Sequence, residues 1–204
     1  MSMNQARSPW IAADFPSTFT ADFGRYKEDA KNDFSLSTNQ KAERKLLVTC
    51  VNTGSTDSPE WTVIGAGVED SSVEYNADIE TITDILGITE TTVNKLEPSQ
   101  SLEPMTIRGG NKVLFKLNDI VERNAVSELA QFEVMLIRAY IDEGTEGTHK
   151  YHAEVHKNCT ITPQSVGGSS YVDMPISINF SNDKTLGTVN GYTKNDTITF
   201  TANS

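Results

Sequence analysis

The 204-residue sequence contains only two cysteines, Cys50 and Cys159, and neither belongs to a CxxC pair or a Cys/His metal-binding pattern. It has no apolar run near the roughly 20 residues that a membrane-spanning helix needs. Its first residues, MSMNQARSPW, lack the apolar segment of a secretory signal. We therefore expect a protein that stays in the cytosol where it is made, with both cysteines as buried thiols.

Basic residues are also scarce. The sequence has only 17 lysines and arginines but 28 aspartates and glutamates, which gives a formal net charge of −11. Nucleic-acid binding normally needs a basic surface that displaces counterions from phosphates, so this composition argues against it. It is compatible with a surface that lets a polyanion slide past without holding it. The alternative is that the acidic charge simply keeps the protein soluble.

Signatures of catalysis are missing as well. The sequence has no GxSxG nucleophile motif and no GxxxxGK[ST] phosphate-binding loop. His149, His152 and His156 lie close together, and on a strand the last two would share one face with Glu154. A surface metal site is one interpretation of this pattern, but a solvated strand face is favoured because short motifs often match by chance. We expect a protein that is not an enzyme and holds no cofactor or metal.

What the sequence does contain is a long, acidic, β-patterned segment at residues 61–107. From Glu69 to Glu103 the sequence contains nine carboxylates and a single lysine, Lys95, so this part of the chain carries most of the net negative charge. The segment is longer than a small domain needs for one pair of strands. It therefore calls for an explanation in terms of function.

Within this segment, two runs rich in threonine and isoleucine flank Gly87. They cover residues 79–86 and 88–96 and predict a long β-hairpin at about residues 78–97. Each strand has a mostly polar or acidic face and little apolar mass. We therefore expect the hairpin to need a partner sheet, which another chain could supply.

The rest of the chain predicts short strands and one helix. Residues 1–44 form a polar extension with scattered aromatics, which we expect to pack on a neighbouring subunit or ring. In the main domain, residues 45–204, the strands outside the hairpin are expected at residues 45–51, 61–64, 68–75, 112–117, 132–141, 151–161, 172–180, 186–189 and 196–201. The helix is expected at about residues 119–130, capped by Asn118 or Asp119. This predicts a mainly β fold, a β-sandwich or split barrel with one flanking helix.

Three parts of the acidic segment resemble the major tail proteins, which are the tail tube proteins of tailed bacteriophages that infect Gram-positive hosts. They are the IGAGVE strand at Ile64–Glu69, the YNADIE turn into a long hairpin at Tyr75–Glu80, and a proline-flanked return strand at Lys95–Ile107. Residues 158–189 also resemble the closing strands of that family. The resemblance covers about residues 45–189.

The resemblance implies a ring-forming subunit, with six copies in a ring and rings stacked into the tail tube. It implies that DNA passes through the lumen without sequence-specific binding, and that the subunit contacts other tail proteins such as the tape measure, terminator and baseplate or distal tail proteins. It places the protein in the virion tail after assembly in the host bacterial cytoplasm. The hairpin would reach between subunits through Ile79, Thr81, Thr83, Ile85, Thr91 and Val93. The candidate lumen acids are Glu80, Asp84 and Glu90.

Two other functions stay open. The first is the tube subunit of a contractile, phage-tail-like injection device or bacteriocin, which uses the same tube fold. A neighbouring sheath gene would indicate this alternative. The second is a carbohydrate- or host-binding β-sandwich module, for which Trp10 and Trp61 are the two tryptophans that could form a binding platform. Glycan binding without assembly would indicate the module.

Overall fold

The computed structural model describes residues 34–145 and 148–203, and the structural statements below concern these residues. The chain divides into two units, residues 1–32 and 33–204, and the described residues belong to the second unit. Most of the predicted N-terminal extension therefore lies outside the described residues. Its described end runs beside the main domain, where Ser35 N donates a hydrogen bond to Tyr140 O (2.8 Å).

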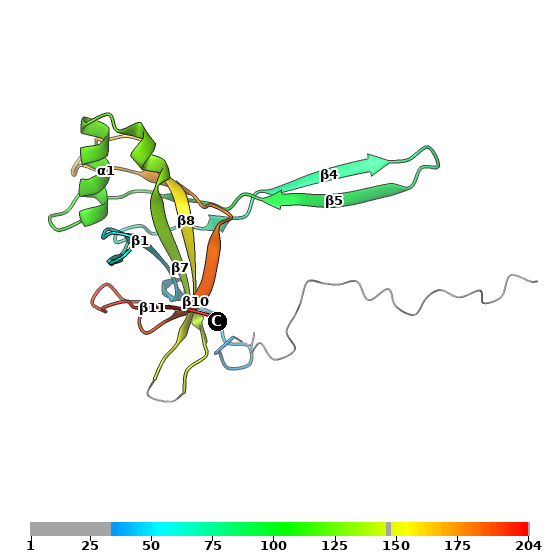
Figure 1. Ribbon diagram of the computed structural model, residues 1–204, viewed down its shortest axis with the longest axis horizontal. Helices are drawn as coiled ribbons and strands as arrows, with labels where there is room; N and C mark the ends of the chain where they lie inside the picture. The colour runs from blue at the N-terminus through cyan, green and yellow to red at the C-terminus, as the bar shows by residue number, and fades with distance from the viewer. Residues whose placement is uncertain (1–33, 146–147, 204) are drawn as a thin grey trace, which may run out of the picture. The chain divides into compact units, whose positions relative to one another are not determined.

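The second unit is mainly β, as predicted, and its described part contains one α-helix (Figure 1). The strands are β1 (Leu47–Asn52), β2 (Trp61–Val63), β3 (Val73–Glu74), β4 (Ala77–Thr83), β5 (Thr89–Leu96), β6 (Ser99–Leu102), β7 (Phe132–Asp142), β8 (Tyr151–Pro163), β9 (Ile176–Asn179), β10 (Lys184–Val189) and β11 (Phe200–Ala202). The helices are α1 (Lys112–Glu122) and two 3₁₀ turns, η1 (Arg44–Leu46) and η2 (Val126–Ala130). None of the described helices has the length and apolarity to cross a membrane.

Nine of the strands form one antiparallel sheet, in the order β2-β1-β7-β8-β9-β6-β3 along its main path. The long strand β8 pairs with β7 along one edge. Along its other edge it pairs with β10 through residues 151–156 and with β9 through residues 160–163. Because its two halves serve different neighbours, the sheet branches at β8 and curls into a half-barrel.

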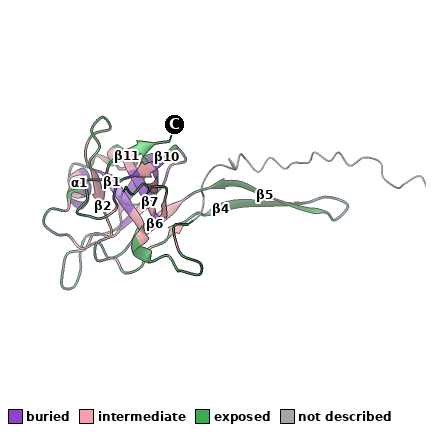
Figure 2. Ribbon diagram, turned by 90° about the horizontal axis from the view of Figure 1, so that it is seen from below, coloured by how far each residue is buried: buried purple, intermediate pink, exposed green. Residues whose placement is uncertain are grey.

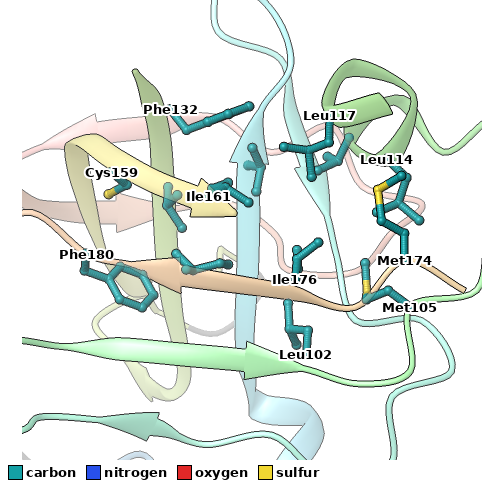
Figure 3. Close-up of a cluster of buried hydrophobic side chains, with 14 of the residues drawn as sticks. Leu102, Met105, Leu114, Leu117, Phe132, Cys159, Ile161, Met174, Ile176 and Phe180 are labelled. Atoms are coloured by element: carbon teal, nitrogen blue, oxygen red, sulfur yellow. The ribbon is translucent and has the colours of Figure 1, made fainter. Parts of the chain in front are cut away.

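Strand β7 is buried on both faces, which confirms the prediction of a central strand. Phe132, Val134 and Leu136 face a core cluster that includes the inner side of α1. The alternate residues Met135 and Ile137 face a second cluster, formed with β1, β8 and the C-terminal strands. Figure 3 shows the first cluster, in which side chains of α1 point toward those of the sheet.

The predicted strand at residues 112–117 is wrong, and the predicted helix is present but not at residues 119–130. Helix α1 begins at Lys112, seven residues earlier than expected. Its N-cap is Asn111, whose side chain accepts a hydrogen bond from the backbone N–H of Leu114 (3.1 Å). This bond satisfies one of the N–H groups that the first turn of a helix leaves without a partner.

The apolar residues of this segment have a helical period. Leu114, Leu117 and Ile120 are buried at spacings of three, and Phe115, which alternation would place inside, is 76% exposed. The helix ends before Asn124, which adopts a positive φ of 53°. Part of the predicted helix is therefore the 3₁₀ turn η2 instead.

Three further strands are shorter than predicted. Of residues 68–75, only Val73 and Glu74 are in a strand, because the preceding chain turns at Gly65 and Gly67, which both adopt positive φ values. Of residues 172–180, only 176–179 form β9. Of residues 196–201, only 200 and 201 are in a strand, β11. The remaining predicted strands are found close to their expected positions.

Candidate functional site

Strands β4 and β5 form the predicted hairpin, and they make a two-stranded sheet of their own. Their register pairs Ile79 with Val93 and Thr83 with Thr89. Every residue of both strands is exposed. Figures 1 and 2 show the hairpin extending away from the sheet, with no buried residue along it.

The base of the hairpin is held by polar contacts. The side chain of Asn76 donates hydrogen bonds to Glu97 O (3.0 Å) and Ser99 Oγ (2.9 Å). In β6, the strand that follows the hairpin, the buried Gln100 accepts a hydrogen bond from the Thr49 hydroxyl of β1 (2.9 Å). Because β6 also pairs with β9, the hairpin is joined directly to the main sheet.

One face of the hairpin carries five of the six predicted contact residues. Cross-strand partners lie on the same face, so these are the Ile79–Val93 pair, the Thr81–Thr91 pair and Thr83. The hydroxyls of Thr81 and Thr91 are 3.4 Å apart, in agreement with a shared face. Ile79 and Val93 are each 56% exposed, so this face is open to a partner.

The opposite face is acidic. Glu80 lies across from Thr92, and Glu90 lies across from Ile82. The side chain of Asn94 donates a long hydrogen bond to Glu80 (3.5 Å). Two of the three candidate lumen acids therefore share a face, and the predicted contact residues of the strands lie on the other.

The remaining predicted lumen acid, Asp84, and the remaining predicted contact residue, Ile85, lie at the tip of the hairpin. Asp84 belongs to the turn and not to a strand, because its Oδ1 accepts hydrogen bonds from the backbone N–H groups of Leu86 (2.8 Å) and Ile88 (2.9 Å). Gly87 completes the turn with a φ of 77°. Ile85 is fully exposed at the end of this turn, away from the strand residues with which it was grouped.

Leu86 and Ile88, which were not among the predicted contact residues, join Ile85 in an apolar tip at this turn. Ile85, Leu86 and Ile88 are 102%, 78% and 59% exposed. The available signal was three large aliphatic residues around a turn glycine, where turns usually carry polar residues. Burial of one such side chain stabilises a complex or fold by about 1.5–3 kcal/mol. The hairpin therefore presents an apolar surface that its own subunit leaves unburied.

The predicted solvated face of β8 is wrong for Glu154 and His156, which are 3% exposed each. Glu154 forms ion pairs with Arg138 of β7 (2.7 Å) and Lys184 of β10 (3.2 Å). Burial raises the pKa of Glu154, but the neighbouring His156 ring and the two cations outweigh burial and hold this pKa well below its usual range. The sheet register brings these partners to Glu154 from both neighbouring strands.

The three histidines make separate contacts. His156 Nδ1 donates to Ser181 O (2.7 Å), His149 Nδ1 lies 2.5 Å from Asp142 Oδ2, and His152 lies 3.6 Å from Glu143. Within residues 34–145 and 148–203, no group of three or more possible ligands is arranged to hold a metal ion.

The tryptophans bear on the alternative of a carbohydrate-binding module. Trp61 packs against the second core cluster and is only partly exposed. Trp10 lies outside the described residues. The described part of the chain thus presents no exposed tryptophan platform.

Comparisons with known proteins found no matching family model and no matching curated protein. Among solved structures, the chain is similar to the anti-feeding prophage cap, a tube terminating cap, with 10% identity and a TM-score of 0.45 over 78% of this chain and 99% of that chain. It is also similar to the PVC sheath/tube terminator of an extracellular contractile injection system in the extended state. There the identity is 9% and the TM-score 0.45, over 74% of this chain and 99% of that chain.

Proposed function

We propose that the chain is a structural subunit of a phage tail or phage-tail-like particle, and that it self-assembles into stacked rings that form a tube for DNA. The observation that carries the proposal is the β4–β5 hairpin. It extends from the sheet, buries none of its residues in its own subunit, and separates a Thr/Ile face from an acidic face. This role is structural and not catalytic.

The apolar surface of the hairpin supports assembly. Seven large aliphatic side chains of the hairpin are exposed: Ile79 and Val93 on the Thr/Ile face, Ile85, Leu86 and Ile88 at the tip, Leu96 at the base, and Ile82 on the acidic face. A two-stranded hairpin is only marginally stable alone in water, and exposed apolar patches on a soluble protein usually mark interaction sites. A partner subunit that covers this surface gains the stabilisation that one protomer cannot reach.

The acidic face supports a role beside DNA. Glu80 and Glu90 lie on one face, and the single lysine of the hairpin, Lys95, is paired with Glu97 (2.6 Å). A negative surface repels the phosphate backbone, so it lets DNA slide without binding it. In the assembled tube this face lines the lumen, and the Thr/Ile face contacts the neighbouring subunit.

Electron microscopy of the purified protein tests this proposal. Negative staining at increasing concentration should show rings or tubes of uniform width, and light scattering should show the matching rise in mass. Single rings that never stack would fit an end piece of the tube better than its repeating subunit. A protein that stays monomeric at high concentration, and is missing from particle tails, would refute the proposal.

A further inference from the structure

We propose that the apolar tip, Ile85, Leu86 and Ile88, docks into a groove beside helix α1 of the next copy of the chain. This inference rests on the proposed function, because it needs copies that assemble. The α1 groove is lined by the turn at residues 107–111, by residues of α1 between 112 and 119, and by Thr53.

The α1 groove has the size and surface of a docking site. It has a volume of about 720 Å³ and a mostly apolar lining, within the range of about 300–1,000 Å³ that is typical of ligand pockets. Ile107 and Phe115 are 42% and 76% exposed beside it, while Leu114 is buried. At Gly109 an added Cβ would meet nothing within 4 Å, so this part of the turn faces open space.

The charges of the two surfaces are complementary. Three basic residues, Arg108, Lys112 and Lys116, border the α1 groove against one acid, Asp119. The hairpin carries four acids against one lysine between residues 77 and 96. Opposite charge of this kind steers two surfaces together and disfavours wrong partners.

The basic residues of the groove are not all neutralised within the subunit. Lys112 pairs with Glu60, and Lys116 lies over the ring of Phe132 at 5.1 Å. Arg108 forms no ion pair with a described residue. The hairpin turn brings one acid, Asp84, next to the tip, so Arg108 is the cation best placed to meet an incoming hairpin.

The length and direction of the hairpin favour a second copy as the occupant. Eight residues at about 3.3 Å each give β5 a length of roughly 26 Å, close to the diameter of about 30 Å of a small domain. Figures 1 and 2 show the hairpin and α1 on opposite sides of the sheet. The tip therefore points away from the groove of its own subunit and can reach across a neighbour.

Residues 1–33 are the other candidate occupant within the chain. They contain five acids and four basic residues, so their charge complements the groove less well than that of the hairpin. We therefore favour the hairpin, and the experiment below separates the two.

Cysteine cross-linking between two variants tests the docking directly. Ile85→Cys and Gly109→Cys are purified as separate proteins, mixed before assembly, oxidised, and run on a non-reducing gel. The native cysteines do not interfere, because Cys50 and Cys159 are fully buried. A disulfide-linked dimer is expected in the mixture and not in either variant alone. In the matched control, Gly167→Cys is used in place of Gly109→Cys, because an added Cβ at Gly167 also meets open space. No cross-link to Ile85→Cys is expected there.

The outcomes separate the docking from the proposed function. One contrary result is tubes that form without a cross-link between Ile85→Cys and Gly109→Cys, and another is tubes with an equally strong cross-link from Ile85→Cys to Gly167→Cys. Either result would overturn the docking but would leave the proposed tube-forming function intact. A cross-link from Trp10→Cys to Gly109→Cys in its place would assign the groove to the N-terminal segment and also overturn the docking. If microscopy shows neither rings nor tubes, the proposed function fails and the docking fails with it.

A second variant measures the contribution of the tip. Ile85→Asp is expected to weaken association about 10- to 100-fold, because it removes an aliphatic side chain from an apolar groove. Its melting temperature should be unchanged, since Ile85 is fully exposed in the subunit. Val166→Asp, at another exposed aliphatic position, is the matched control and should assemble normally. Normal assembly of Ile85→Asp would contradict the docking.

Discussion

Shortening the β4–β5 hairpin is expected to leave the subunit folded and to abolish assembly. In the variant, residues 80–92 are replaced by Asn-Gly, so that a two-residue turn joins Ile79 to Val93. These two residues are already cross-strand partners, and Asn-Gly is the preferred sequence for such a turn. The base of the hairpin, with its Asn76 contacts, is kept.

The magnitude follows from what the removed residues contact. All of residues 80–92 are exposed, and none belongs to either core cluster. Among the described residues, the one side-chain hydrogen bond that is lost across the cut is the 3.5 Å contact between Asn94 and Glu80. Changes at exposed positions usually alter the free energy of unfolding by about 0.5 kcal/mol or less, and each halving of a flexible loop by about 0.6 kcal/mol. We therefore expect a net change within about 1 kcal/mol.

A change of about 1 kcal/mol shifts the melting temperature of a domain of this size by about 2–4 °C. Circular dichroism on heating measures this shift, and light scattering with negative-stain microscopy measures assembly on the same sample. The expected result is a near-normal melting temperature with only monomers present. A melting temperature lowered by more than about 10 °C, or an insoluble product, would show that the hairpin is part of the core. Tubes formed by the shortened variant would show that it is not an assembly element.

Three further predictions concern single side chains. Leu117→Ala should lower the free energy of unfolding by about 2–5 kcal/mol in urea titrations, because Leu117 is buried. Phe115→Ala should lower it by less than about 1 kcal/mol, because Phe115 is exposed. Equal effects would contradict the assignment of this segment to a helix. Glu154→Gln should lower the free energy of unfolding at pH 7 by about 3 kcal/mol, because it leaves the half-buried guanidinium of Arg138 without its charged partner. The pKa of Glu154 is lowered from 4.5, so the stability that its charge contributes is present above about pH 4.5 and is lost as the pH falls through the folded-state pKa. The free energies of unfolding of wild type and variant should therefore converge in acid. Parallel plots of these free energies against pH would refute this. Glu80→Lys combined with Glu90→Lys should leave the width of the tube unchanged and slow DNA release from assembled particles, and unchanged release would place both residues outside the lumen.

The main strands and the hairpin could be predicted because their signals are local. Residues 132–141 are apolar at successive positions, which is typical of a strand buried on both faces, and β7 is such a strand. The hairpin was marked by two threonine-rich runs around Gly87, and its register confirms that the two runs pair. The faces of the hairpin then follow from strand alternation alone, which explains why Glu80 and Glu90 share a face, whereas Asp84 lies in the turn.

The first two turns of α1 could not be predicted because their apolar residues satisfy two periods at once. Val113, Phe115 and Leu117 alternate as in a strand, whereas Leu114, Leu117 and Ile120 repeat as on a helix. The sequence signal that favours the helix is the N-cap at Asn111, directly after a glycine turn. Packing decides between the two, since the helical set forms one buried side against the sheet.

The charged cluster on β8 could not be predicted from the sequence for a different reason. The partners of Glu154 are Arg138 and Lys184, which lie 16 and 30 residues away along the chain. They meet only because β7 and β10 flank β8 in a particular register. A pattern within one strand contains no information on such pairs, so an alternating polar residue was taken to be solvated.

The way the hairpin is attached bears on why assembly would be ordered. An exposed, threonine-rich pair of strands is an aggregation hazard unless something limits how it pairs. Here the base continues into β6, which is joined to the sheet by its pairing with β9 and by the buried bond between Gln100 and Thr49. The acidic face repels the same face of another hairpin, which disfavours stacking of hairpins upon one another. In the proposed assembly, one apolar tip and one acidic face would favour a single repeated contact, and a repeated head-to-tail contact produces closed rings or a continuing stack.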